Sequence, residues 1–122
     1  MALILLIDDD ADIRSVLRRI LQSAGHGTIE AENGKEGVQR MQDAHPDIVI
    51  TDILMPEKDG IETIEDIRRI RPAPKIIAMS GGGRYQGFEF LEIAKCLGAD
   101  ALLAKPFRRA ALLETIAQVL QK

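Results

Sequence analysis

Five short strand-like runs, four of them mainly apolar, divide the sequence, and segments whose apolar residues recur at helical spacing follow them. In the third run Ile48, Val49 and Ile50 are β-branched and adjacent, which is typical of a strand buried on both faces of a parallel sheet. Strands that alternate with amphipathic helices predict a parallel sheet with right-handed crossovers. The predicted strands are Leu3 to Ile7, Gly27 to Ala31, Asp47 to Asp52, Lys75 to Met79 and Ala101 to Ala104.

The segments between these strands carry helix signals. Gly25 is placed to close the first helix, Asn33 with Glu36 gives a capped start to the second, and Pro72 stops the third. The predicted core stripes are Ile13, Val16, Leu17, Ile20 and Leu21; then Ile61, Ile64, Ile67 and Ile70; then Phe90, Ile93, Ala94 and Leu97; and finally Leu113, Ile116, Ala117 and Leu120.

Length and charge narrow the class of protein. A chain of 122 residues is predicted to form a single domain over residues 1–122. A net charge of -3 offers no electrostatic footprint for nucleic acid, and no apolar run is long enough for a membrane span, so we expect a cytoplasmic protein. Cys96 is alone, which excludes a disulfide within the chain, and its apolar surroundings predict a buried residue.

Four of the five predicted strands end on polar residues. Asp8 and Asp9 follow the first strand, Asp52 ends the third, Ser80 follows the fourth and Lys105 follows the fifth. The carboxyl ends of parallel strands meet at one edge of the sheet. With the flavodoxin-like strand order 2-1-3-4-5 and helices on both faces, the four contributing strands are neighbours, which predicts one contiguous site.

The chemistry of this site follows from its charges. Carboxylates about 4 Å apart repel by roughly 4 kcal/mol at an effective dielectric constant near 20, so Asp8, Asp9 and Asp52 need a compensating charge. Oxygen ligands without a nearby His or Cys favour Mg²⁺ or Mn²⁺. Lys105 adds a second positive charge. A cation, an ammonium group and the Ser80 hydroxyl around one carboxylate are what an aspartyl-phosphate requires, with Asp52 as the nucleophile.

The whole chain resembles the receiver domain of response regulators in two-component signalling. The matching features are the acidic pair Asp8 and Asp9, the pattern D-x-x-x-P from Asp52 to Pro56, the hydroxyl of Ser80, and the K-P-F sequence that begins at Lys105. The resemblance implies a phosphoacceptor that catalyses its own phosphorylation and signals through the Ser80 loop and the fourth and fifth helices.

The resemblance also implies ligands and partners. Asp9, Asp52 and the backbone carbonyl of Leu54 would bind Mg²⁺, whereas Asp8 would act through water. The phosphoryl donor would be a phosphohistidine on a histidine kinase or a histidine phosphotransfer protein. A cis peptide bond before Pro106 would direct the ammonium group of Lys105 into the site.

The chain departs from the family pattern in two places. Leu102 stands three residues before Lys105, where many receivers carry an aromatic residue that moves inward on activation. The segment from Ser80 to Lys105 is also longer than usual and begins with three glycines, residues 81–83. We therefore expect the switch to be the ordering of this loop rather than the rotation of a ring.

Alternative interpretations remain for each feature and for the whole. Taken alone, Asp8 or Asp9 is equally compatible with a helix cap, and Ser80 with a turn. An aspartyl-phosphate hydrolase of the haloacid dehalogenase type would share the fold, but it needs an acid where this chain has Leu54. A flavodoxin-like FMN protein would need a hydroxyl-rich loop after the first strand, where this chain has Asp8 and Asp9.

Contacts with other proteins are expected on the last two helices. Phe88 and Leu91 lie off the predicted core stripe of the fourth helix, and Leu112 and Val119 lie off that of the fifth. They predict a docking or dimer surface, with rim packing as the alternative. Since the sequence ends after the fifth helix, we expect a receiver with no output domain attached, which is either a stand-alone protein or one excised from a larger regulator. We expect it to be monomeric or dimeric on phosphorylation and to signal to a downstream protein.

Overall fold

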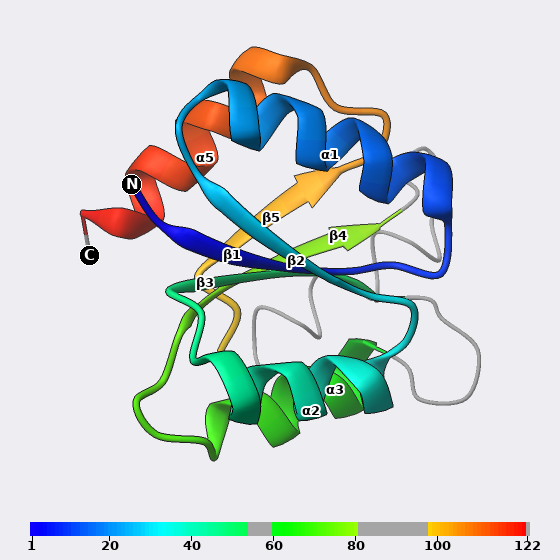
Figure 1. Cartoon of the computed structure of the whole chain (residues 1–122), viewed down its shortest axis with the longest axis vertical. Coiled ribbons are helices and arrows are strands. Elements are labelled where there is room, and N and C mark those ends of the chain that lie inside the picture. Colours follow the sequence, from blue (N-terminus) through cyan, green and yellow to red (C-terminus); the bar gives the residue numbers. More distant parts are fainter. Residues whose placement is uncertain (54–59, 81–97, 122) are drawn as a thin grey trace.

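The computed structural model describes residues 1–53, 60–80 and 98–121 (Figure 1). Five parallel strands form one sheet in the order β2-β1-β3-β4-β5, as the sequence predicts. The elements are β1 (Leu3–Ile7), α1 (Ala11–Ser23), β2 (Gly27–Ala31), α2 (Gly34–Ala44), β3 (Ile48–Asp52), α3 (Gly60–Arg68), β4 (Lys75–Ser80), β5 (Ala101–Ala104) and α5 (Arg109–Leu120).

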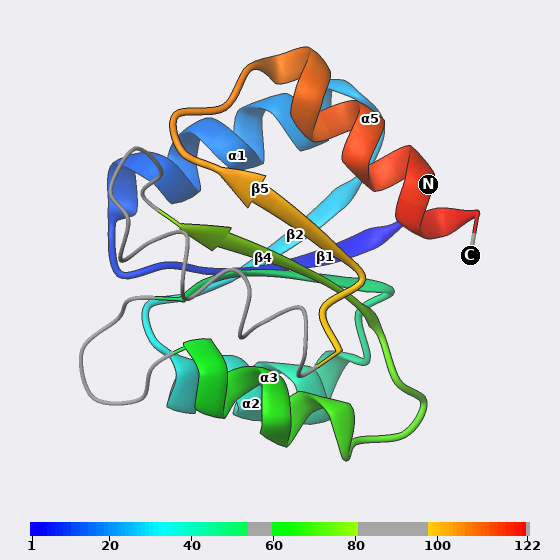
Figure 2. The same cartoon turned by 180° about the vertical axis from the view of Figure 1, so that it is seen from behind.

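Helices cover both faces of this sheet. Helices α1 and α5 lie on one face, and α2 and α3 lie on the other (Figures 1 and 2). Side chains of β1 alternate between the two layers: Ile4 and Leu6 pack toward α1 and α5, whereas Leu5 and Ile7 pack toward α2 and α3. All five residues of β3 are buried, as expected of a central parallel strand.

The strand register brings the carboxyl ends of four strands to one edge. Ile7 pairs with Thr51, Asp52 pairs with Met79, and Ser80 pairs with Ala104. Consequently the residues that follow β1, end β3 and β4, and follow β5 meet at this edge. The sequence prediction of a contiguous site depends on this register.

Local signals in the sequence fix the first two helices. The side chain of Asp10 accepts hydrogen bonds from the backbone N–H groups of Asp12 and Ile13 and so caps α1. Asn33 caps α2 in the same way through the N–H of Glu36. Gly25 has a φ of 91° just beyond α1, a conformation that disfavours other residues.

Gly37 serves packing rather than chain flexibility. It is buried in α2, and a Cβ atom at this position would overlap with the side chain of Ile7 in β1. Glycine therefore lets α2 approach the sheet next to the carboxyl end of β1.

Two of the predicted core stripes need correction. Val16 is 49% exposed because it lies at the edge of the α1 stripe, whose buried centre is Leu17 and Leu21. In α5 the buried residues are Leu112, Ile116 and Val119, whereas Leu120 is 46% exposed. The predicted α5 stripe is rotated by about one residue, roughly 100°, because two adjacent faces of this helix carry apolar residues at helical spacing.

The docking surface predicted from Leu112 and Val119 is therefore wrong. Both side chains are fully buried against the sheet and cannot contact a partner. Phe88 and Leu91, Cys96, the predicted helix stripe at residues 90–97 and the glycines at 81–83 lie outside the described residues. Among the described helices, none combines the length and apolar character that crossing a membrane requires.

The corrected stripe predicts unequal effects of truncating two leucines in α5. Leu112→Ala should lower the free energy of unfolding by about 2 to 5 kcal/mol, because it leaves a cavity in the core. Leu120→Ala removes the same atoms from a half-exposed position and should cost less than about 1 kcal/mol. Urea denaturation of both variants measures the difference, and equal losses would contradict this assignment of the core.

Candidate functional site

Three carboxylates converge at the carboxyl edge of the sheet. Asp8 and Asp9 follow β1, and Asp52 is the last residue of β3. Each offers a carboxylate oxygen, and these oxygens lie within 4.8 Å of one another. Asp8 and Asp52 are buried and Asp9 is exposed, so the group opens to solvent on the side of Asp9.

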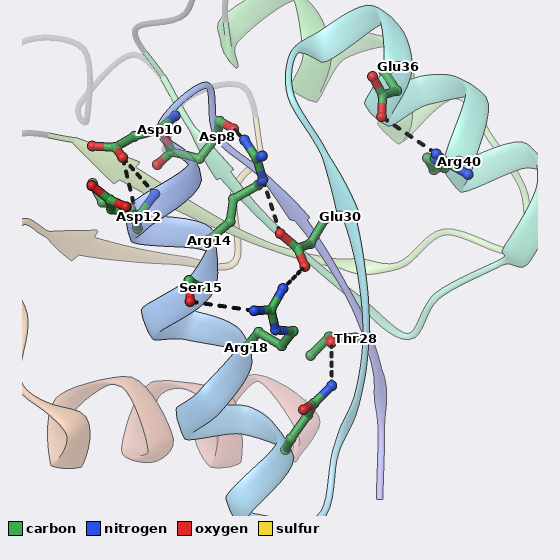
Figure 3. A network of polar contacts seen from close by, with 12 residues as sticks. Asp8, Asp10, Asp12, Arg14, Ser15, Arg18, Thr28, Glu30, Glu36 and Arg40 are labelled. Atoms are coloured by element: carbon green, nitrogen blue, oxygen red, sulfur yellow. Dashed lines mark hydrogen bonds and ion pairs between the residues drawn. The ribbon is translucent and has the colours of Figure 1, made fainter.

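The polar atoms of Asp8 are fully engaged within the protein. Its backbone N–H donates to the carbonyl of Ala31 at 3.2 Å, and its Oδ1 accepts from the N–H of Asp10 at 2.9 Å. Its Oδ2 accepts from the ammonium group of Lys105 at 2.7 Å. Arg14 donates to its backbone carbonyl at 2.6 Å, next to the acidic loop (Figure 3). Asp8 is therefore arranged to hold its neighbours in place.

Lys105 supplies the positive charge expected from the sequence. It directly follows β5, and the peptide bond to Pro106 is cis, as the resemblance implied. Besides its contact with Asp8, Nζ lies 3.4 Å from Oδ2 of Asp52. Burial by itself would lower the pKa of Lys105, but the hydrogen bond that Lys105 donates to Asp8, together with the charges of Asp52 and Asp8, raises the pKa above its ordinary value. The ammonium group is therefore charged at neutral pH.

The surroundings of Asp52 disfavour its ionised form. Burial raises the pKa of Asp52 to about 6, and the negative charge of Asp8 adds to the effect, although Lys105 and the backbone N–H of Ile53 oppose it. One ammonium group thus does not fully offset the cost of a second buried carboxylate. Without a metal ion, the negative charge of ionised Asp52 is only partly compensated.

A hard divalent cation fits this donor set. Carboxylate oxygens are the ligands that Mg²⁺ takes, usually one or two together with several waters. Asp9 and Asp52 each offer a carboxylate oxygen for this role. Both carboxylate oxygens of Asp8 accept hydrogen bonds, one from the N–H of Asp10 and one from Lys105. The ligand roles that the resemblance implied for the three acids stay predictions. Leu54, the expected carbonyl ligand, lies outside the described residues.

Ser80 lies at the same edge through its backbone. It is the last residue of β4, one residue beyond the predicted strand, and it pairs with Ala104 immediately before Lys105. Met79, its neighbour, pairs with Asp52. The fold therefore places the backbones of all the predicted polar site residues on three adjacent strands and the end of β1.

Comparison with known proteins identifies the family. The model of the response regulator receiver domain matches residues 4–117. The chain belongs to this family. It is 38% identical to the chemotaxis protein CheY of Thermotoga maritima, with 95% of each chain covered. It is 36% identical to the chemotaxis protein CheY of Halobacterium salinarum, with coverage of 96% of this chain and 95% of the relative.

Solved structures agree with this receiver assignment. Chemotaxis protein CheY4 of Vibrio cholerae superposes with a TM-score of 0.85 at 30% identity, with 98% of each chain covered. A putative response regulator from Chloroflexus aurantiacus superposes with a TM-score of 0.92 at 26% identity, covering 99% of this chain and 98% of that one. A receiver is a phosphoacceptor and a signalling module rather than a classical enzyme, and histidine kinases are its partners. The acidic group is typical of the receiver Mg²⁺ site.

One contact at the site was not predicted from the sequence. The sequence predicts no role for Arg14, yet its side chain donates a hydrogen bond to the backbone carbonyl of Asp8. A weak signal was present, because Arg14 and Arg18 lie one helical turn apart while Glu30 is one residue from the end of the neighbouring strand β2. Charge pairing between α1 and β2 could have been inferred, but not the bond to Asp8.

The raised pKa of Asp52 predicts how pH affects the metal-free protein. Since the folded-state pKa exceeds the unfolded-state value, ionisation of Asp52 destabilises the fold progressively as pH rises from about 4 to 6, and fully above that range. Asp52→Asn removes this cost. In a chelator, its melting temperature should exceed that of the unmodified protein near pH 7.5, with a smaller difference near pH 5.

Asp43→Asn, on the exposed surface of α2, is the matched control for the change in charge. Thermal unfolding followed by circular dichroism measures both variants at each pH. A lower melting temperature for Asp52→Asn near pH 7.5 would contradict the electrostatic account, as would the same gain in the control.

Proposed function

We propose that Asp52 accepts a phosphoryl group from a phosphohistidine, carried by a histidine kinase or a histidine phosphotransfer protein, in a Mg²⁺-dependent reaction. One observation carries the proposal: in a receiver chain, the Asp52 carboxylate is buried 3.4 Å from the Lys105 ammonium group and shares a cluster with the exposed Asp9. Residues 1–122 would act as one receiver unit that responds to such a donor.

The chemical step transfers the phosphoryl group between two nucleophiles. An Asp52 carboxylate oxygen forms a bond to phosphorus while the phosphorus–nitrogen bond breaks, and the histidine ring leaves with the electron pair and takes up a proton. Lys105 would stabilise charge on the phosphoryl oxygens, and its hydrogen bond to Asp8 would keep it in position. Mg²⁺ bound by Asp9 and Asp52, with the Leu54 carbonyl as a further ligand, would neutralise additional charge. Asp8 would reach this ion through water.

The same proposal includes the signal. A phosphoryl group on Asp52 adds up to two negative charges and several hydrogen-bond acceptors. Ser80 is the last residue of β4, the strand next to β3, and its hydroxyl would respond to this group. Its movement would order the segment after β4, change the surface of the last helices and so alter binding to a downstream protein. With a net charge of -3, that partner would be a protein rather than nucleic acid.

The first test is phosphorylation by acetyl phosphate. Mass spectrometry should detect one added phosphoryl group that is labile to hydroxylamine, and labelling should require Mg²⁺ or Mn²⁺ and stop in a chelator. Asp52→Asn should not be labelled, whereas Asp43→Asn should be labelled like the unmodified protein. Undiminished labelling of Asp52→Asn would refute the assignment of the phosphoacceptor.

A second test separates transmission of the signal from phosphorylation itself. With beryllofluoride as the phosphoryl mimic, Ser80→Ala should retain binding of the mimic but lose the amide chemical-shift changes beyond β4. Leu102→Ala should retain those changes and instead lower the melting temperature, because Leu102 packs against the core layer under α2 and α3. The opposite result, with Leu102→Ala uncoupled and Ser80→Ala normal, would favour a switch centred on residue 102.

A further inference from the structure

Arg14 links the acidic loop to a charged network that includes Glu30 of β2 and Arg18, one turn further along α1. Its Nε donates to Oε1 of Glu30 at 3.1 Å, and its Nη1 donates to the backbone carbonyl of Asp8 at 2.6 Å (Figure 3). The side chain is only 12% exposed. One planar guanidinium group therefore joins β2 to the residue that follows β1, and the rigid geometry of its donors suits two simultaneous bonds.

Glu30 holds Arg14 in this orientation. Its other carboxylate oxygen accepts from Arg18 at 2.6 Å, so both oxygens are engaged. Burial alone would raise the pKa of Glu30, but the hydrogen bonds and charges of Arg18 and Arg14 outweigh burial and lower the pKa below its ordinary value. The anchor is thus ionised at neutral pH. These ion pairs alone are enough to connect α1 to β2. The hydrogen bond from Arg14 to the Asp8 carbonyl is an additional contact that this connection does not require.

The bond to Asp8 bears on Asp9 because the two residues share a peptide group. The carbonyl of Asp8 and the N–H of Asp9 lie in one rigid plane. Arg14 holds this plane through its carbonyl oxygen. The N–H of Asp8, which belongs to the preceding peptide group, is bonded to the carbonyl of Ala31. Together the two bonds restrain the backbone on both sides of the Asp8 Cα, from which the chain continues to Asp9 and its exposed carboxylate.

We propose that Arg14 is a positioning residue for cation binding, which holds the Asp8–Asp9 peptide group so that the Asp9 carboxylate faces Asp52. The inference rests on the proposed function, since it concerns the same Mg²⁺ site. Residues that orient the ligands of a metal commonly change its affinity by about 10-fold to 100-fold when they are replaced.

Positioning and simple electrostatics predict opposite signs. Removing the positive charge of Arg14 from the neighbourhood of the site should, through charge alone, strengthen the binding of a divalent cation. Loss of positioning should weaken it. Arg14→Met therefore distinguishes the two effects by the direction of the change. Arg14→Lys keeps the charge but cannot reproduce the two-bond geometry, so positioning predicts weaker binding for this variant too.

The experiment is calorimetric titration of the full chain with Mg²⁺ alone. The dissociation constant should rise by about tenfold or more for Arg14→Met and Arg14→Lys. Arg18→Met is the matched control, because it removes an equal charge and the bond to the other Glu30 oxygen, and Arg18 has no bond to Asp8 in the described network. This variant should change the constant by less than about threefold. Unchanged or tighter binding in both Arg14 variants would overturn the proposal.

A second measurement needs no metal. The N–H of Asp10 is bonded to the side chain of Asp8, so hydrogen exchange at this amide reports on the order of the acidic loop. Exchange should be faster in both Arg14 variants and unchanged in Arg18→Met. If Arg14→Met fails to fold by circular dichroism, the milder Arg14→Lys decides the question. Unchanged exchange in a folded Arg14 variant would count against the proposal.

Mg²⁺ binding by Asp9→Asn separates an error in the cation site from an error in the role of Arg14. If the unmodified protein does not bind Mg²⁺, or if Asp9→Asn binds it equally well, the assignment of the cation site itself is wrong. If Asp9→Asn loses binding while both Arg14 variants keep it, only the positioning role of Arg14 is refuted.

Discussion

The structure of the site depends on repulsion between carboxylates that one ammonium group only partly relieves. Asp8 is completely buried, and its hydrogen bond with Lys105 at 2.7 Å makes that burial tolerable. Asp52 is farther from the same ammonium group and keeps a raised pKa. This difference separates the two acids by role. Asp8 is a structural partner of Lys105. The charge of Asp52 is the one that a further cation would compensate.

The fold makes such a site possible because it stabilises the backbone independently of the acids. The buried apolar side chains of β1 and β3 pack against helices on both faces, and β3 pairs with a strand on each side. Local repulsion at the edge can therefore persist without unfolding the sheet. The network of Arg14, Glu30 and Arg18 adds a polar restraint between α1 and β2 (Figure 3). At this edge of the sheet, Asp8 is thus held by several hydrogen bonds, whereas Asp9 is exposed to solvent.

The features that were predicted correctly from the sequence are those that local and periodic patterns of residues determine. All five strands match their predicted bounds to within one residue: β3 begins one residue later, at Ile48, and β4 extends by one residue to Ser80. The caps at Asp10 and Asn33 act as side-chain oxygens near helix starts usually do. The convergence of Asp8, Asp52 and Lys105 followed from strand order alone, because parallel strands share a carboxyl edge.

What the sequence could not supply depends on tertiary contacts. Leu112 and Leu113 are adjacent leucines on neighbouring faces of α5, and only docking onto the sheet decides which one is buried. The reach of Arg14 to Asp8 likewise requires the placement of α1 against β2. The burial that raises the pKa of Asp52 comes from packing around the end of β3, which a pattern of acids does not reveal.

Titration of the Asp52 carboxyl by carbon NMR, with and without Mg²⁺, tests whether positive charge beside this acid is insufficient. We predict a pKa of about 6 in the metal-free protein, because burial and Asp8 disfavour the charged form. Saturating Mg²⁺ should lower that pKa substantially, since the cation stabilises the carboxylate. An ordinary carboxyl pKa without metal, or the same raised value with and without Mg²⁺, would contradict the view that Asp52 is an undercompensated acid at a cation site.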